Sequence, residues 1–125
     1  LDKEETNRSY LYGRLLAVAD RIEYRTYDEK DKARVTNAKR YMSTFSQRPF
    51  ETWKMIEENI QPYVNKLEFP ERRFYENLLH EINGLFDVDS FGDNSKLDGL
   101  YLLGFHHQAY ELTSKKSKFN VKEVV

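Results

Sequence analysis

The sequence predicts an all-α fold, a compact bundle of about five helices in one domain. Apolar residues recur every three or four positions in five separate stretches, the spacing that places them on one side of a helix. Two of the three prolines stand where such stretches begin, and proline is favoured in the first turn of a helix. No stretch shows the alternation of a half-buried strand. The 125 residues suffice for one core and leave too little for a second domain.

The first two helices are predicted in the N-terminal third of the chain. Residues 4–27 carry a broad apolar stripe, and a charged turn follows at residues 28–31. Residues 32–44 show a weaker pattern that still predicts a single helix. The positions that define the two stripes are Leu11, Leu15, Val18 and Ile22 in the first, and Val35, Ala38, Met42 and Phe45 in the second.

Prolines mark the third and fourth helices. Pro49 suits the first turn of the third helix and Pro70 the first turn of the fourth. Pro62 lies inside the third pattern, where it is expected to kink the helix or to end it early. The apolar positions are Phe50, Trp53, Ile56, Ile60, Val64 and Leu67 in the third helix, and Phe74, Leu78, Ile82 and Leu85 in the fourth.

The fifth helix is predicted to begin near Ser95, which with Asp98 resembles a capping box, and to run to about residue 112. It is apolar nearly all round, so we expect it to be the central and most buried helix. Residues 1–113 then form the helical domain, and residues 114–125 form a polar, basic tail that we expect to be disordered. The residues expected to be buried together are Leu15, Val18, Trp53, Ile56, Leu78, Ile82, Leu100 and Leu103.

The sequence offers no pattern typical of catalysis, of a metal site or of a cofactor. Residues 87–92 resemble the start of a calcium-binding loop, but Phe91 stands at its fifth position and Asp98 at its twelfth, so we expect a polar loop without calcium. His106 and His107 are adjacent and point about 100° apart on a helix, which prevents them from sharing a metal. No phosphate-binding glycine loop or nucleophile motif occurs. We therefore expect that the protein is not an enzyme.

Composition indicates the compartment. The chain has no cysteine, which excludes disulfides and thiolate metal sites and suits a reducing cytoplasm. No run of 18 apolar residues occurs, and the N-terminal residues do not resemble a signal peptide. We expect a cytoplasmic protein that makes no membrane contact.

Charge is unevenly distributed, although the net charge is only −1. Residues 1–48 have an excess of basic residues, residues 49–94 have an excess of acidic ones, and residues 32–50 contain no acidic residue. At 100° per residue, Arg21 and Arg25 lie within about 20° of Arg14 around the first helix, which suggests a track for a phosphate backbone. The alternative is a solvated face whose cations pair with the acidic middle. The candidate nucleic-acid-binding residues are Arg14, Arg21, Arg25, Lys32, Arg34, Lys39, Arg40 and Arg48.

Four blocks of the sequence stand out, of which the first opens the predicted bundle and the last lies in its fifth helix. The blocks are Tyr10 to Val18, then Asn37 with Arg40, Tyr41, Met42, Ser46 and Pro49, then Lys66 with Leu67, and finally Gly99 to Gln108. In this order the four blocks resemble the C-terminal domain of the large subunit of type I-C CRISPR complexes.

The resemblance implies a function. In that family the same region is also made separately as a small subunit, and the length of this chain resembles the free form. The resemblance implies a non-catalytic subunit that contacts the backbone and large subunits and another copy of itself. It would stabilise the guide RNA–target DNA heteroduplex or the displaced DNA strand through the phosphate backbone, because base pairing reads the sequence in such complexes. Two alternatives are the same domain within the large subunit, and a generic helical adaptor for proteins.

Overall fold

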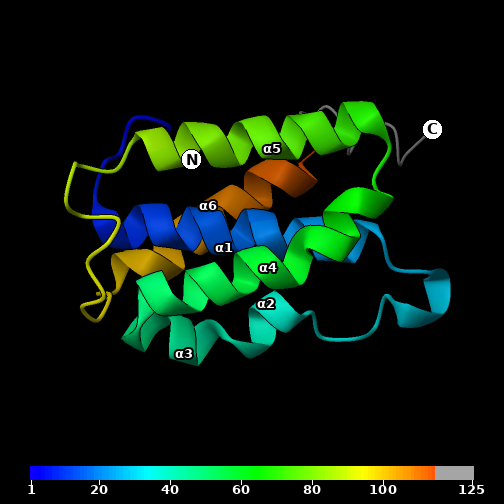
Figure 1. Ribbon diagram of the computed structural model, residues 1–125, viewed down its shortest axis with the longest axis horizontal. Helices are drawn as coiled ribbons and strands as arrows, with labels where there is room; N and C mark the ends of the chain where they lie inside the picture. The colour runs from blue at the N-terminus through cyan, green and yellow to red at the C-terminus, as the bar shows by residue number, and fades with distance from the viewer. Residues whose placement is uncertain (115–125) are drawn as a thin grey trace.

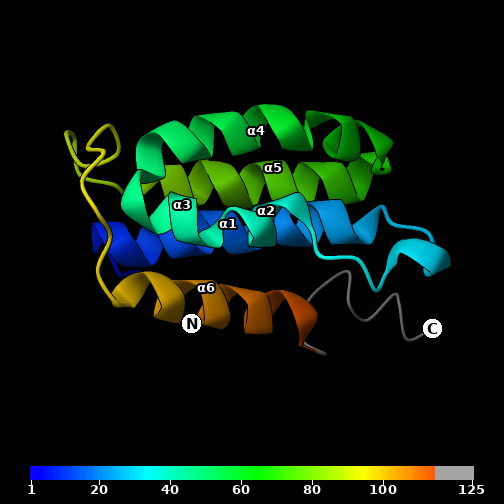
Figure 2. The same ribbon diagram turned by 90° about the horizontal axis from the view of Figure 1, so that it is seen from below.

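The computed structural model describes residues 1–114, in which α2, α4, α5 and α6 pack against α1, whereas α3 packs mainly against α4 (Figures 1 and 2). The predicted all-α fold is confirmed, because the described residues form six α-helices and one 3₁₀ turn and contain no strand. The predicted disorder concerns residues 114–125, of which all but Ser114 lie outside the described residues. The elements are α1 (Arg8–Arg25), η1 (Glu29–Asp31), α2 (Asn37–Arg40), α3 (Met42–Gln47), α4 (Pro49–Lys66), α5 (Phe69–Gly84) and α6 (Leu100–Thr113).

The central helix is α1, and not the last helix as the sequence suggested. Every residue from Ser9 to Ala19 is buried, because α1 packs against α2, α4, α5 and α6. Figure 2 shows α4 and α5 on one side of α1 and α6 on the other. The side chain of Asn7 caps the start of α1 by accepting a hydrogen bond from the backbone N–H of Tyr10.

The helix α6 is an outer helix with one buried face. Tyr101, Phe105 and Leu112 are buried, whereas Leu100 and Leu103, both expected in the core, are 38% and 44% exposed. The prediction failed because an apolar helix buries only the faces that neighbouring helices cover. The start of α6 was also misplaced: Ser95 bonds to Asp93, and the helix begins at Leu100, whose N–H donates to the carboxylate of Asp98.

Other core predictions are confirmed. Leu15, Val18, Trp53, Ile56 and Ile82 are buried in one hydrophobic cluster, and Leu78 packs against it while partly exposed. Aromatic rings extend this cluster toward the loop after α5. The ring of Phe91 stacks on that of Tyr12 at a centroid distance of 5.7 Å, so the loop residue predicted to prevent calcium binding is part of the packing.

The prediction of one helix over residues 32–44 was wrong. The chain there forms two short helices, α2 and α3, and Val35 lies outside both with 53% of its surface exposed. The side chain of Thr36 caps α2 by accepting a hydrogen bond from the N–H of Lys39, so α2 cannot begin earlier. In α4, by contrast, the helix continues past Pro62 to Lys66, and α5 begins one residue before Pro70.

Candidate nucleic-acid interface

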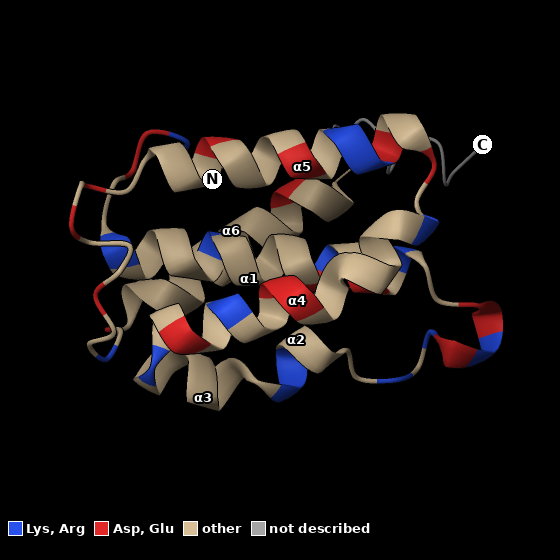
Figure 3. Ribbon diagram, viewed as in Figure 1, with Lys and Arg blue, Asp and Glu red and all other residues tan. Residues whose placement is uncertain are grey.

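A groove of about 800 Å³ lies between α1, α6 and the segment that leads into α2. Four of the basic residues predicted from sequence line it: Arg21, Lys32, Arg34 and Lys39. We call it the basic groove. Figure 3 shows basic residues on α2 and on the loop that precedes it. Among the lining residues Asp20 is the one with an acidic side chain. The remaining wall residues are Ala17, Tyr24, Ala33, Val35, Thr36, Met42, Phe105, His106, Ala109, Tyr110, Leu112 and Thr113.

Two tyrosines near the end of α1 hold the cationic side chains of the groove. The ammonium of Lys32 lies 4.6 Å from the ring centroid of Tyr24, and the guanidinium of Arg21 lies 5.7 Å from the same ring. The guanidinium of Arg34 lies 5.5 Å from the ring of Tyr27. Such cation–π contacts contribute about 0.5–1 kcal/mol each at exposed sites, enough to orient long side chains. Arg34 also pairs with Asp31 of the same loop at 3.7 Å, and its side chain stays 57% exposed beside this carboxylate.

The end of the segment that leads into α2 is tied to α1 by the buried carboxylate of Glu23, which is 1% exposed. Both of its oxygens accept from the backbone N–H of Asn37 at 3.0 Å, and the hydroxyl of Tyr27 donates to the same carboxylate. The hydroxyl of Thr36 donates to Asp20. The start of α2 is therefore held against α1 by hydrogen bonds to two carboxylates, and the loop carrying Lys32 and Arg34 is fixed at both ends.

Asp20 moderates the positive charge of the groove. Burial raises the pKa of its carboxyl group, and the hydrogen bond from Thr36 and the nearby charge of Lys39 oppose that rise. A carboxylate held among cations partly cancels their field, so the groove is positive but not uniformly so.

The other four predicted residues do not line the groove, and Arg14, Arg21 and Arg25 do not form one exposed row. Arg14 is only 3% exposed, and its Nε donates to the side chain of Gln108 in α6 at 2.7 Å. Arg25 pairs with Glu71 of α5 at 2.5 Å. Their predicted angles around α1 were close, but α5 and α6 cover that side of the helix along much of its length.

Arg48 and Arg40 lie elsewhere on the surface. Arg48 pairs with Glu51 one turn along the chain at 2.8 Å, which raises the pKa of Arg48. Arg40 is exposed on α2 beside Lys39 but does not line the groove.

The wall formed by α6 was missed by the sequence reasoning. His106 is exposed in the groove, and Tyr110 is 72% exposed. The sequence did contain a signal for an exposed face on this helix. A helix that is apolar all round, at the edge of a small domain, has more apolar surface than its neighbours can cover. His107 lies on another side of α6, where its Nδ1 is 3.0 Å from the hydroxyl of Tyr10.

Within residues 1–114, no group of three or more histidine, cysteine or acidic side chains is placed to hold a metal ion. None of the helices described here is both long enough and apolar enough to cross a membrane.

A family model for Csd1, a CRISPR-associated protein, matches residues 1–113. The chain belongs to this family. The match ends at the last residue of α6, so it covers every described helix and the whole basic groove. It confirms the family-level resemblance seen in the sequence blocks. No curated protein matches the chain significantly.

Proposed function

We propose that this domain is a non-catalytic small subunit of a type I-C CRISPR effector complex in the cytoplasm, and that its basic groove holds a nucleic-acid backbone. The observation that carries the proposal is the gathering of Arg21, Lys32, Arg34 and Lys39 along one groove of a CRISPR-associated protein. The ligand would be the guide RNA–target DNA heteroduplex or the displaced DNA strand. Lysine and arginine contacts to phosphates position a strand without reading its sequence, which suits a complex in which base pairing supplies specificity.

A second surface supports the bridging role in this proposal. Leu100, Leu102 and Leu103 at the start of α6 are between 38% and 49% exposed. Exposed apolar residues gathered on one helix are typical of surfaces that another protein covers. The backbone and large subunits of the complex, or another copy of this chain, would provide that cover.

The same groove would work identically if the domain were the C-terminal part of a large subunit. The partners would then be contacted in cis, and the phosphate contacts would be unchanged. A purely protein-binding adaptor differs in one measurable property, because its binding would lack the steep salt dependence that phosphate contacts produce.

The test compares two triple variants in the assembled complex. The groove variant replaces Lys32, Arg34 and Lys39 by alanine. The control replaces Lys54, Lys66 and Arg73, which are exposed outside the groove, and removes the same charge. We expect the groove variant to weaken DNA binding about equally for every target sequence. The log–log salt slope should fall by about 0.9 for each lost contact to a double-strand phosphate, or about 0.7 for a single strand.

The control variant should keep the wild-type slope. If the groove variant also keeps the wild-type affinity and slope, at full occupancy of the subunit, the groove does not contact nucleic acid.

A further inference from the structure

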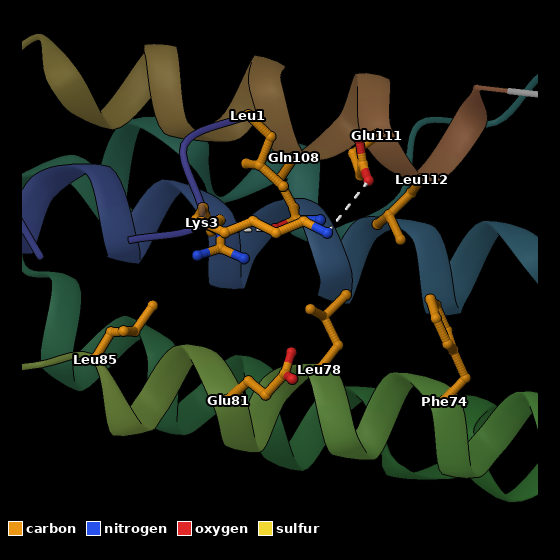
Figure 4. A pocket seen from close by; sticks show the side chains of 10 residues that line it. Leu1, Lys3, Phe74, Leu78, Glu81, Leu85, Gln108, Glu111 and Leu112 are labelled. Carbon is orange, nitrogen blue, oxygen red and sulfur yellow. Dashed lines mark hydrogen bonds and ion pairs between the residues drawn. The ribbon is translucent and has the colours of Figure 1, made fainter. Parts of the chain in front are cut away.

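A second pocket, of about 540 Å³, lies between α1, α5 and α6 on a different side of α1 from the basic groove. Figure 4 shows Phe74, Leu78 and Glu81 of α5 directed toward α6, from which Gln108 and Glu111 project. Half of its ten lining residues are apolar and half are polar or charged, a mixture that could bind an amphipathic group. The apolar lining consists of Leu1, Phe74, Leu78, Leu85 and Leu112.

The polar feature of this pocket is a buried cation without a counter-charge in contact. Arg14 lines the pocket while only 3% exposed. Its Nε is bonded to the neutral amide of Gln108, and its Nη1 is buried without a hydrogen-bond partner among the described residues. A buried guanidinium is costly unless a carboxylate or phosphate pairs with it, and guanidinium geometry matches such groups with two parallel bonds.

The charges around the pocket decide between these two anions. Glu81 and Glu111 also line it, and Glu111 is paired with Lys3 at 4.0 Å. Burial lowers the pKa of Arg14, whereas Tyr10 and then Glu81 oppose that shift. A nucleic-acid strand would bring several phosphates close to these glutamates, and like charges would repel it. A single carboxylate on an apolar stem would satisfy Arg14 and contact the leucine walls.

We propose that this pocket receives an acidic side chain, carried on an apolar segment of a neighbouring protein subunit, that pairs with Arg14. That the pocket binds a carboxylate is inferred from its lining residues alone. That the carboxylate belongs to another protein subunit rests on the proposed function, in which the domain is part of a complex. Arg14 is then a contact for a protein partner and not part of a nucleic-acid track.

The first experiment tests the chemistry with hexanoate as the probe, titrated into the full chain while the Nε–H resonance of Arg14 is followed by NMR. Hexan-1-ol provides the uncharged comparison. We expect a saturable shift with hexanoate and at least tenfold weaker binding of hexan-1-ol. Arg14→Met should weaken hexanoate binding at least tenfold, with its folding verified by circular dichroism.

Two variants at exposed glutamates, which should not affect folding, provide a second test of the carboxylate site. Glu81→Gln removes a repelling charge from the pocket and should tighten hexanoate binding severalfold. Glu76→Gln lies on the same helix, is exposed and does not line the pocket, so it should leave binding unchanged. No saturable shift, equal binding of both probes, or equal effects of the two glutamate variants would overturn the carboxylate site.

The second experiment tests the source of the carboxylate in the assembled complex. A benzophenone amino acid at Leu85, on the pocket wall, should cross-link to a protein segment that contains an aspartate or glutamate. The same group at His80, exposed on α5 and outside the pocket, should not capture that segment. Capture of nucleic acid from Leu85, or of nothing, would overturn the protein source. The groove variant should leave this cross-link intact. The protein contact at the Arg14 pocket and the nucleic-acid contact at the basic groove can therefore succeed or fail independently of each other.

Discussion

Gly13 of α1 and Gly104 of α6 sit where the two helix backbones come into direct contact. A Cβ on Gly13 would lie 2.1 Å from the carbonyl oxygen of Tyr101, and a Cβ on Gly104 would lie 2.1 Å from that of Tyr10. Any side chain at either position would force the helices apart. Because α1 and α6 form two walls of both the basic groove and the Arg14 pocket, this contact sets the width of each.

Replacing Gly104 by alanine is therefore expected to destabilise the fold. Overpacking a tight contact costs about 1–3 kcal/mol, which exceeds the gain of up to about 1 kcal/mol that alanine brings to a helix. Gly84→Ala in α5 is the matched control, because its Cβ would meet nothing within 4 Å. Urea unfolding should show a loss for Gly104→Ala and no loss for Gly84→Ala. Equal stability of the two variants would contradict the close approach.

Trp53 is expected to be a major contributor to stability. Its side chain is 0% exposed, and its ring meets that of Phe45 edge to face at 6.5 Å. Trp53→Ala should lower the free energy of unfolding by about 3–5 kcal/mol. Trp53→Phe should cost much less, because the indole Nε1 has no hydrogen-bond partner among the described residues to lose. Similar losses for the two variants, measured by chemical denaturation, would contradict this expectation.

Glu23 is expected to organise the basic groove without lining it. In Glu23→Ala the N–H of Asn37 loses its carboxylate acceptor. A hydrogen bond to a charged group contributes about 1.5–3 kcal/mol, so stability should fall by about that amount. Hydrogen exchange should also become faster at residues 26–36. Glu29→Ala, an exposed change in the same loop, should alter neither quantity. Unchanged exchange in Glu23→Ala would mean that this carboxylate does not hold the loop.

Asp20→Asn should change both stability and binding. Burial raises the folded-state pKa of Asp20, so the folded state binds more protons than the unfolded state between the unfolded pKa, about 3.9, and the raised value. The free energy of unfolding therefore falls as the pH rises through that window, and it stays lower above it. Asp20→Asn removes this loss, so the variant should exceed the wild type in stability at neutral pH and match it near pH 3.

Asp20→Asn also removes the acidic residue of the groove lining, so in the assembled complex it should tighten nucleic-acid binding. Denaturation at several pH values and a DNA titration check the two effects. A variant less stable than the wild type at neutral pH would contradict the first, and weaker DNA binding would contradict the second.

Arg25 is expected to matter for stability and not for nucleic acid. Its pair with Glu71 is largely buried, with side-chain exposures of 18% and 14%. Arg25→Ala leaves that carboxylate without its partner and should cost about 1–3 kcal/mol, between the values for exposed and buried pairs. In the assembled complex the salt slope of DNA binding should match the wild type. A salt slope lower than that of the wild type would show that Arg25 contacts phosphate.

Periodicity in the sequence was enough to identify the helices and much of the core. Trp53, Ile56 and Ile82 are buried as their spacing predicted, and Pro49 begins α4. These features depend on local chain geometry, which repeats every 3.6 residues whatever surrounds the helix. The late start of α2, at Asn37, was not predicted, because it depends on hydrogen bonds from Thr36 and Asn37 to carboxylates of α1.

The roles of the charged residues were decided by the tertiary structure. The sequence by itself determined the angles of Arg14, Arg21 and Arg25 around α1, but an angle does not say which neighbour covers it. In the fold Arg14 meets Gln108 of α6, Arg25 meets Glu71 of α5, and Arg21 lines a groove with residues that follow α1 in the chain. Whether a cation is buried, is paired with a carboxylate or lines a groove depends on these long-range contacts, which no local pattern encodes.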